Sequence, residues 1–329
     1  MKHILNKLFA QEVLERAEAK DVLSGISEGQ FNDYQIASFL TVFKMRNITV
    51  DELSGFSDYL KERCVRIDFS DVDNIDLCGT GGDGKDTFNI STLASFVVAG
   101  AGYKVSKHGN YGVSSICGSS NVLESLGLEF TNDQNKLKRQ IDQANITILH
   151  APLFHPAMKE VAPIRKQLGV STFFNMLGPM VNPSFPSKQL VGVYSLHLQR
   201  YYKYILESQD ISYRIVHTLD GYDELSLTGK AKIVSPNSEY VFDPITSTHT
   251  HVSQDDILGG NSIEEAKNIF TKIINTEGTE KQNAVVCANA ALAIQCYDNN
   301  KSFSDAYAEA QSSLKNKNAL NSLNKLLAI

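Results

Sequence analysis

The sequence contains no tryptophan and only eight prolines and five cysteines in 329 residues. The cysteines are odd in number and show no CxxC or CxH spacing, so we expect reduced thiols in a cytoplasmic protein, without a disulfide framework or a zinc site. Apolar runs are short and broken by glycine, as in residues 96–102, which excludes a membrane span. The N-terminal twenty residues carry acidic and polar side chains too early for a signal peptide.

A basic excess is also missing. Lysine and arginine total 31 against 37 aspartates and glutamates, which gives a net charge of −6. Proteins that bind the nucleic-acid backbone usually carry a basic excess, so we expect no nucleic-acid partner. An anionic substrate would have to be held by local groups such as backbone amides, a few cations or a metal.

The chain length and its patterning predict two domains. Residues 1–66 show helical patterns only: apolar positions within 4–14 predict one N-terminal helix, and further helices begin near residues 32 and 49. After residue 66, strands and helices alternate. We therefore predict an α/β fold, with a small all-helical domain over 1–66 and a large α/β domain over 67–329 whose mostly parallel central sheet is covered by helices.

The elements of the second domain are predicted from apolar runs and helical spacing. The predicted strands are 75–78, 104–106, 146–149, 190–194, 213–218, 231–234 and 240–242. The predicted helices are 90–99, 122–126, 134–144, 157–168, 198–209, 263–274, 283–295 and 302–315.

A glycine-dense segment, Gly79-Thr80-Gly81-Gly82-Asp83-Gly84, follows the first predicted strand. Its small residues let backbone N–H groups converge on an anion. The next segment, Asn89-Ile90-Ser91-Thr92, offers an N-cap and two hydroxyls at a helix start, where the helix dipole favours phosphate. The alternative is a plain turn and a capped helix. We expect neither a dinucleotide fold nor a P-loop ATPase; the GxxxxGK[ST] motif is unmatched because Asp86 stands where it requires Ser or Thr.

A second polar segment, Lys107-His108-Gly109-Asn110, follows the predicted strand 104–106. Because ligands of open α/β sheets bind beyond the carboxyl ends of strands, this loop and the glycine segment should border one crevice. Lys107 supplies a cation for phosphate, and His108 and Asn110 can face an organic substrate. The alternative is a core histidine in an ordinary polar loop.

Adjacent carboxylates stand at Asp223-Glu224. Their repulsion costs free energy unless a cation lies nearby, and their hard oxygens suit Mg²⁺. The alternative is a solvated acidic loop.

Arg165 lies ten residues after His155, nearly three helical turns on, so it should share the helix face that begins at His155. An arginine side chain can bind a planar carboxylate through two hydrogen bonds. The alternative is a surface arginine without a ligand.

Together the motifs resemble one family. GTGGDG, NIST, KHGN, HPAMK, FNMLGP and DGYDE occur in this order, over almost the whole chain, in anthranilate phosphoribosyltransferases. The resemblance implies a helical domain completed by a segment near 156–185, and a homodimer joined through the helical domains. It implies that Mg²⁺ is the cofactor, and that anthranilate and 5-phosphoribosyl 1-diphosphate react to N-(5-phosphoribosyl)anthranilate and diphosphate.

The resemblance also implies roles for individual residues. Donor contacts fall on Gly79, Gly82, Asp83, Thr87, Asn89, Ile90, Ser91, Thr92, Lys107, Ser115 and Ser119. Anthranilate contacts fall on Gly79, His108, Asn110 and Arg165. The metal ligands are Ser91, Asp223 and Glu224, and the catalytic residues are Lys107 and Asp83. The chain departs from the family pattern at Tyr111, Ser120-Asn121 and Ser171.

Two other functions fit this architecture: a pyrimidine nucleoside phosphorylase-like enzyme and a non-catalytic relative that binds nucleic acid. A nucleoside requires neither a metal clamp nor a carboxylate-binding arginine, so the acid pair and Arg165 disfavour the first. The net charge of −6 disfavours the second.

Overall fold

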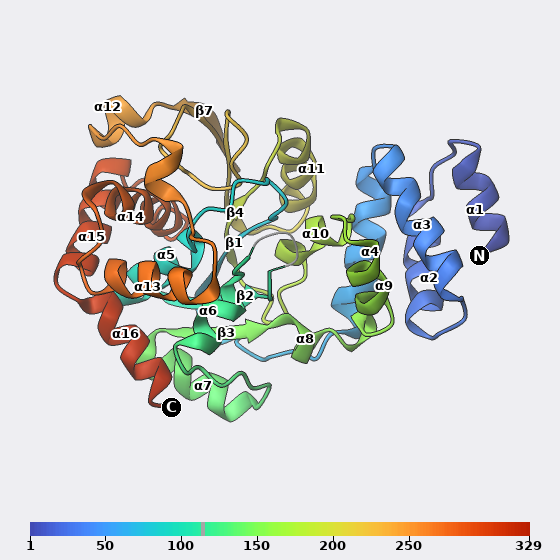
Figure 1. The fold of residues 1–329 in the computed structure, drawn as a ribbon, viewed down its shortest axis with the longest axis horizontal. Coiled ribbons are helices and arrows are strands. Elements are labelled where there is room, and N and C mark those ends of the chain that lie inside the picture. The colour runs from blue at the N-terminus through green and yellow to red at the C-terminus, as the bar shows by residue number, and fades with distance from the viewer. Residues whose placement is uncertain (113–115) are drawn as a thin grey trace.

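The computed structural model of the protein describes residues 1–112 and 116–329. A bundle of helices at one end carries the N-terminus, and an α/β body carries the C-terminus (Figure 1). The bundle begins with α1 (Lys2–Phe9), α2 (Arg16–Ser27), α3 (Asp33–Met45) and α4 (Val50–Arg63). Among the helices in the described part of the chain, none combines the length and apolar character needed to span a lipid bilayer.

The N-terminal helix is shorter than its apolar spacing predicts. In place of one helix over 4–14, the structure has α1 and α2, separated by residues 10–15. Gln11 adopts a left-handed backbone conformation with φ 64°, and the Leu14 amide donates a hydrogen bond to the Glu52 carboxylate 2.9 Å away. The single-helix prediction is wrong because this bond to a distant helix takes Leu14 out of the helical path.

Two helices from later in the chain complete the bundle: α9 (Val161–Leu168) packs beside α3, and α10 (Phe174–Leu177) contacts α4 (Figure 1). Phe173 stacks on Phe56 with ring centroids 4.5 Å apart and meets Phe39 and Phe43 edge-on. Buried aromatic pairs of this kind add to the stability gained from apolar burial. The division of the chain into domains at residue 66 stays a prediction.

The chain between residues 156 and 168 is not one helix. The sequence predicts a helix over 157–168, whereas the structure has a 3-10 turn η1 (Pro156–Met158) followed by α9. Because Pro163 has no N–H for the carbonyl of residue 159, α9 must begin just before it. His155 and Arg165 therefore do not lie on one continuous helix, and the prediction that they share a helix face is wrong.

The α/β body is built on one seven-stranded sheet of order β3-β2-β1-β4-β5-β6-β7. The four pairs from β3 to β5 in this order are parallel, and the pairs β5–β6 and β6–β7 are antiparallel. The strands are β1 (Asn74–Gly79), β2 (Lys104–Gly109), β3 (Ile146–His150), β4 (Lys188–Gly192), β5 (Ser212–Thr218), β6 (Ala231–Ser235) and β7 (Ser238–Phe242). The predicted α/β fold with a mostly parallel sheet is confirmed.

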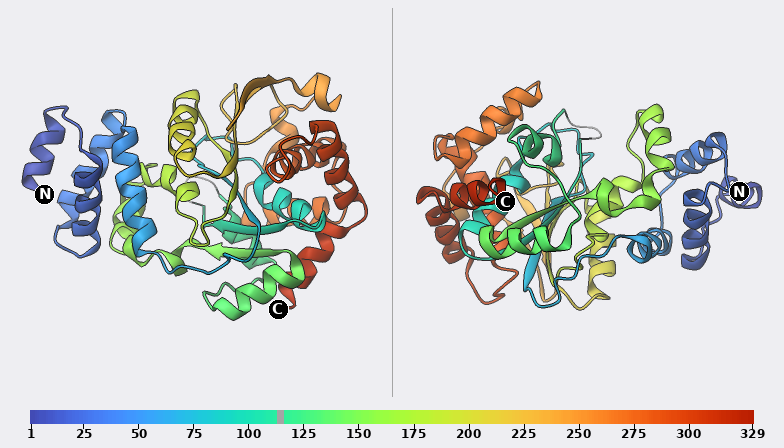
Figure 2. Two further views of the ribbon diagram at one scale, coloured as in Figure 1. Left: turned by 180° about the vertical axis from the view of Figure 1, so that it is seen from behind. Right: turned by 90° about the horizontal axis from the view of Figure 1, so that it is seen from below.

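Helices cover this sheet. The view from behind shows the sheet between the bundle and the helices α13–α16 (Figure 2). The covering and connecting helices are α5 (Ile90–Gly100), α6 (Ser119–Ser125), α7 (Gln134–Ala144), α8 (Ala151–Phe154), α11 (Leu196–Glu207), α12 (Pro244–Thr248), α13 (Ile263–Ile274), α14 (Glu280–Ile294), α15 (Phe303–Lys315) and α16 (Asn318–Leu327). Two further 3-10 turns are η2 (Gly178–Met180) and η3 (Gln254–Ile257).

The two faces of the sheet belong to different apolar cores. Along β4, Leu190 packs into a core with α5 and α14, whereas Val191 joins the core of the helical bundle. Successive side chains of a strand point to opposite faces, so neighbouring residues serve the two cores. The bundle and one sheet face thus share a continuous core, which fixes the bundle against the sheet.

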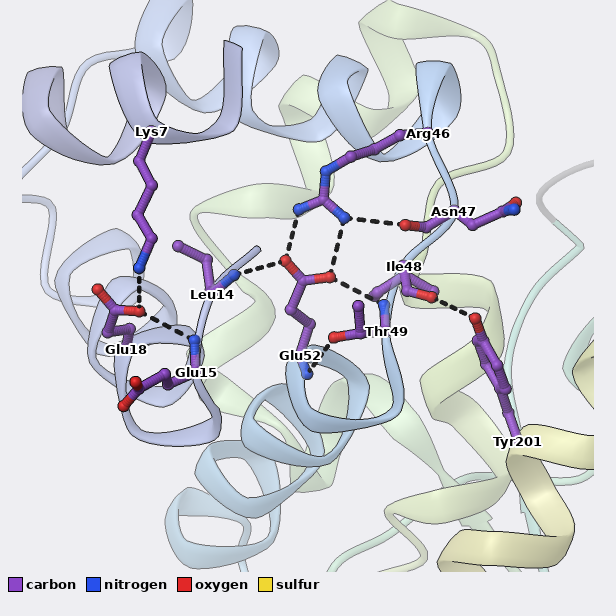
Figure 3. A network of polar contacts seen from close by, with 10 residues as sticks. All are labelled: Lys7, Leu14, Glu15, Glu18, Arg46, Asn47, Ile48, Thr49, Glu52 and Tyr201. Atoms are coloured by element: carbon purple, nitrogen blue, oxygen red, sulfur yellow. Dashed lines mark hydrogen bonds and ion pairs between the residues drawn. The ribbon is translucent and has the colours of Figure 1, made fainter. Parts of the chain in front are cut away.

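A buried ion pair holds the bundle together. Both oxygens of the Glu52 carboxylate accept hydrogen bonds from the Arg46 guanidinium, at 2.5 and 3.0 Å, and they also accept the backbone amides of Leu14 and Thr49 (Figure 3). Burial alone would raise the pKa of Glu52, but the bonds from Arg46 and the amides outweigh it and lower that pKa. One carboxylate therefore joins the α1–α2 linker, the end of α3 and the start of α4.

We expect Glu52→Ala to lower the free energy of unfolding by about 3 kcal/mol, because it leaves the Arg46 guanidinium buried without its partner. Urea unfolding followed by circular dichroism measures this loss. The control is Asp58→Ala, which breaks the exposed ion pair with Arg16 and should cost less than about 1 kcal/mol. Equal losses in the two variants would contradict a special role for the buried pair.

Candidate active site

The ends of the parallel strands define where a ligand can bind. Chain order runs from β1 through β2 to β3 on one side and from β4 to β5 on the other, so it reverses between β1 and β4. Ligands of open α/β sheets bind beyond the carboxyl ends of the strands at such a reversal. Here the loops that follow β1, β2 and β5 border one cavity.

This cavity has a volume of about 290 Å³ and is also lined by residues of α9 and α10. It brings together every predicted site residue that the structure describes: Gly79, Gly82, Asp83, Thr87, Asn89, Ile90, Ser91, Thr92, Lys107, His108, Asn110, Ser119, Arg165, Asp223 and Glu224. Ser115 lies outside the described residues. Residues from separate motifs thus meet in one place, while the role of each stays a prediction.

The glycine segment forms a turn that only glycine adopts easily. Gly81, Gly82 and Gly84 have φ angles of 65°, 80° and 68°, a conformation that turns backbone N–H groups toward an anion. The Gly81 amide donates a 2.6 Å hydrogen bond to Asp223 Oδ2. A Cβ atom on Gly79 would overlap the same carboxylate, so glycine is required where the turn meets the acid pair.

Helix α5 begins directly behind the glycine turn. Asn89 occupies its N-cap position, but its side chain makes no capping bond; Asn89 Nδ2 donates instead to the Cys117 carbonyl oxygen, 3.0 Å away in the loop after β2. The expected side-chain cap is therefore wrong, and Asn89 ties two loops together. No N-cap side chain occupies the first N–H groups of α5, and Ser91 and Thr92 line the cavity, as an anion site at a helix N-terminus requires.

Asp223 is buried and Glu224 is half-buried, which excludes the alternative of a solvated acidic loop. Asp223 is 7% exposed. Burial, then the neighbouring carboxylates Asp83 and Glu224, raise its pKa well above the usual range. Burial also raises the pKa of Glu224 to about 7, with Lys107 lowering it and Asp83 raising it. The mutual repulsion of Asp83, Asp223 and Glu224 favours a bound cation.

These residues fit a magnesium ion that shares its coordination with a substrate. Asp83 Oδ2 is buried and has no hydrogen-bond partner among the described residues, so the carboxylates have oxygen atoms to offer. No three His, Cys, Asp or Glu side chains in the described ranges converge into a complete metal site. Mg²⁺ usually binds through one or two carboxylates and completes its shell with water and substrate phosphates, which this arrangement allows.

Lys107 is a buried cation at the same end of the cavity. Its side chain is 1% exposed, and Nζ donates hydrogen bonds to the Leu77 carbonyl oxygen and to Ser91 Oγ, the latter at 3.4 Å. Its charge opposes the effect of burial on the pKa of Glu224. Lys107 thus lies between the start of α5 and the acid pair.

His108 also lines the cavity, and it packs against His155, which lies outside the lining; both rings are buried. His108 and His155 have ring centroids 5.2 Å apart, and His108 Nδ1 lies 3.0 Å from the Gly178 carbonyl oxygen. Burial is the main cause that lowers the pKa of each ring to about 4. Both imidazoles are therefore neutral at neutral pH.

Arg165 also lines the cavity, although the argument from a continuous helix is wrong. Its Nη2 donates to Asn175 Oδ1 at 3.2 Å, and its guanidinium lies 5.2 Å from the Phe174 ring centroid. Burial lowers the pKa of Arg165 to about 10, so the group stays cationic at neutral pH. Within the described ranges, Arg165 Nε and His108 Nε2 are buried without partners, which indicates a place for a polar ligand.

Two residues outside the cavity hold the acid pair in place, and neither was predicted. Asn289 of α14 is fully buried, and its amide group exchanges two hydrogen bonds with the Leu225 backbone, at 2.9 and 3.0 Å. A Cβ atom on Gly192, at the end of β4, would overlap the Asp223 carbonyl oxygen. The sequence could have pointed to Asn289, because it is an amide side chain within the apolar stretch 284–294 and a buried amide needs hydrogen-bond partners.

Two family models match the chain. The helical bundle domain of a glycosyl transferase family matches residues 2–64, and the a/b domain of a glycosyl transferase family matches residues 71–320. The fold and the cavity at the strand ends thus define a two-domain glycosyl transferase.

Individual relatives narrow this class. The anthranilate phosphoribosyltransferase of Flavobacterium johnsoniae is 63% identical over 294 residues, 89% of each chain. The Thermus thermophilus enzyme of that name has a TM-score of 0.89 at 29% identity, with 98% of both chains covered. The Saccharomyces cerevisiae enzyme, in complex with PRPP and Mg, has a TM-score of 0.88 at 24% identity over 98% of this chain and 96% of that one. This chain belongs to the anthranilate phosphoribosyltransferase family.

The buried histidines predict how stability depends on pH. Because burial lowers the pKa of His108 and His155 to about 4, the unfolded chain binds protons below about pH 6.5 that the folded chain excludes. Above that pH the two histidines cost the folded state nothing. As the pH falls toward 4, the free energy of unfolding drops by up to about 1.4 kcal/mol per pH unit for each histidine. In urea unfolding at pH 7 and pH 5, His155→Gln should lose less stability on acidification than the wild type.

The matched control is His3→Gln, at an exposed position of α1, which should respond to acid as the wild type does. If His155→Gln and the wild type lose the same stability between the two pH values, His155 does not exclude a proton in the folded state.

Proposed function

We propose that this protein transfers the 5-phosphoribosyl group of 5-phosphoribosyl 1-diphosphate to the amine of anthranilate, giving N-(5-phosphoribosyl)anthranilate and diphosphate, the second step of tryptophan synthesis from chorismate. One observation carries this proposal. A single cavity has a glycine turn and acidic side chains at one end, and the cationic Arg165 with the neutral His108 at the other. A donor with a charged tail and a small aromatic acid match these two ends.

At the donor end, the main difficulty is the departure of a highly charged group from C1 of the ribose. The amides of the glycine turn, the start of α5 and Lys107 all border the place where that charge would develop. Fixed dipoles and cations aimed at a developing charge lower the barrier, because they need no reorganisation during the reaction. Donor contacts are proposed for Gly79, Gly82, Asp83, Thr87, Asn89, Ile90, Ser91, Thr92, Lys107, Ser115 and Ser119.

We propose Mg²⁺ as the cofactor, held by Ser91, Asp223 and Glu224. When bound, the ion would neutralise negative charge on the departing diphosphate. The raised pKa values of Asp223 and Glu224 support the proposal, since a cation relieves the mutual repulsion of the two carboxylates.

Lys107 and Asp83 are the proposed catalytic residues. Lys107 brings its ammonium group to the start of α5, beside the place of the leaving group. Asp83 Oδ1 accepts the Lys85 amide at 3.1 Å, while Oδ2 is buried without a partner in the described part of the chain. That oxygen is oriented to accept a hydrogen bond from the donor.

At the acceptor end, the amine of anthranilate is neutral at pH 7 and needs no strong base to attack C1. The requirement is orientation: the C1–O bond to diphosphate breaks, the N–C1 bond forms, and the amine nitrogen then releases a proton. Arg165 would bind the carboxylate of anthranilate, and His108, Asn110 and Gly79 would border the ring and the amine. Holding the two reactants in line contributes several kcal/mol. We expect no covalent enzyme intermediate.

We further propose a cytoplasmic homodimer joined through the helical bundle. The bundle exposes the apolar side chains Phe9, Val13 and Tyr34, which are 59%, 49% and 86% exposed, and an interface would remove such groups from water. The free cysteines of the described chain are compatible with a reducing compartment.

The activity is tested by the fluorescence of anthranilate, which should fall only when the full-length protein, the donor and Mg²⁺ are all present. Consumption of thymidine with orthophosphate, and none of anthranilate, would replace the transferase by a nucleoside phosphorylase.

In the same assay, Asp223→Asn combined with Glu224→Gln should move the half-maximal Mg²⁺ concentration upward by about tenfold or more, because two charged ligands are lost.

The control for the double variant is Asp220→Asn, in the same loop but outside the cavity lining, which should keep the wild-type Mg²⁺ curve. If the curve of the double variant also stays in place, the acid pair is not the metal ligand set.

We expect Arg165→Ala to raise the KM for anthranilate by about tenfold to a hundredfold, because a charge-assisted pair with the carboxylate is lost. The KM for the donor should change less than about twofold. Steady-state kinetics with each substrate varied in turn measure both constants. Lys166→Ala, which removes the neighbouring exposed cation of α9, is the control, and an unchanged anthranilate KM in Arg165→Ala would refute the assigned role.

A further inference from the structure

Lys85 is a cation in the cavity lining to which the proposed mechanism gives no role. It follows the last glycine of the turn and is half-buried. Its Nζ lies over the ring of Tyr222, 4.8 Å from the centroid. None of the ion pairs within residues 1–112 and 116–329 includes Lys85. The ammonium group therefore rests on a ring face, without a carboxylate partner in that part of the chain.

The Lys85 side chain spans two loops of the site. Its backbone is fixed in the turn after β1, where the Lys85 amide donates to Asp83 Oδ1 at 3.1 Å. Its far end reaches the loop after β5, because a Cβ atom on Gly221 would lie 3.5 Å from Lys85 Cε. Tyr222, which is 1% exposed, immediately precedes the acid pair. Lys85 thus connects the proposed diphosphate loop with the proposed metal loop.

The charged groups of the cavity lining indicate what the Lys85 ammonium group can bind. Asp83, Asp223 and Glu224 are acidic side chains in the same lining, and an entering diphosphate brings negative charge of its own. Lys107 is buried and already bonded to Leu77 and Ser91, while Arg165 lies at the acceptor end. Lys85 is the cation of this lining whose four-carbon stem leaves its ammonium free to move.

The contact between the Lys85 ammonium group and the Tyr222 ring is weak, so little free energy is lost when the group moves away. A cation over an aromatic face is held weakly where water has access, whereas a hydrogen bond between an ammonium group and a phosphate oxygen joins two full charges. Exchange of the ring for a phosphate oxygen is therefore favourable.

We propose that Lys85 is a further donor-binding residue, whose ammonium group leaves the Tyr222 ring and binds the diphosphate of the sugar donor across the mouth of the cavity. The inference rests on the proposed function, which supplies the donor. No bond of the donor is made or broken by Lys85, so it acts on the affinity for the donor and for the released diphosphate, and not on the affinity for anthranilate.

The test uses the full-length protein with Mg²⁺ and inorganic diphosphate, with ribose 5-phosphate as the comparison ligand, by titration calorimetry. Lys85→Gln keeps most of the length of the side chain and removes its charge, so the Kd for diphosphate should rise about tenfold, as for the loss of one charge-assisted bond. Lys85→Arg should stay within about threefold of the wild type. The control is Lys325→Gln, at an exposed lysine on α16, which should bind diphosphate as the wild type does. In steady-state kinetics, Lys85→Gln should raise the KM for the donor and leave the KM for anthranilate unchanged.

A diphosphate Kd in Lys85→Gln within twofold of the wild type would overturn the inference. So would a loss confined to ribose 5-phosphate, which would place the ammonium at the other end of the donor, and so would a wild type that does not bind diphosphate. If diphosphate binding depends on Lys85 while anthranilate is never consumed, the proposed function fails and the diphosphate contact stands.

Discussion

The rest of the site depends on three acidic side chains, the buried Asp223 and the half-buried Asp83 and Glu224, which repel one another where the strand order reverses. Burial raises the pKa of Asp223 and of Glu224, and the nearby Asp83 carboxylate raises both further. The scaffold holds this unfavourable arrangement: Gly79 and Gly192 leave room for the Asp223 loop, and Asn289 fixes the backbone next to it. A bound cation would relieve the repulsion among these groups, so the site is suited to a cation and its phosphate ligand.

The two ends of the cavity come from two parts of the molecule. The donor end is made by loops of the sheet, whereas Arg165 and Asn175 come from the segment that packs on the helical bundle through Phe173. The position of the acceptor end relative to the donor end therefore depends on the packing of the bundle against the sheet. The core shared by the bundle and β4 makes that packing apolar and extensive, and the Glu52 network keeps the bundle itself rigid.

Most of the fold could be predicted from the sequence, because the strands are apolar runs bounded by glycine and polar residues and the longer helices show regular spacing. The predicted helices 134–144 and 263–274 coincide with α7 and α13. The predictions that are wrong concern places where a single local feature interrupts a regular pattern. Leu14 leaves the helical path for Glu52, Pro163 sets the start of α9, and the Asn89 side chain bonds the next loop instead of its own helix.

The sequence by itself determined which chemical groups the site contains and in what order along the chain, since motifs of glycine, lysine, histidine and paired acids are local. The tertiary structure decided which of these groups meet and what charge they carry. Asp223 accepts the amide of Gly81 from 142 residues away, and the neutrality of His108 follows from burial by segments distant in the chain. Burial and partners depend on how separate elements pack against one another, so no local pattern of residues contains them.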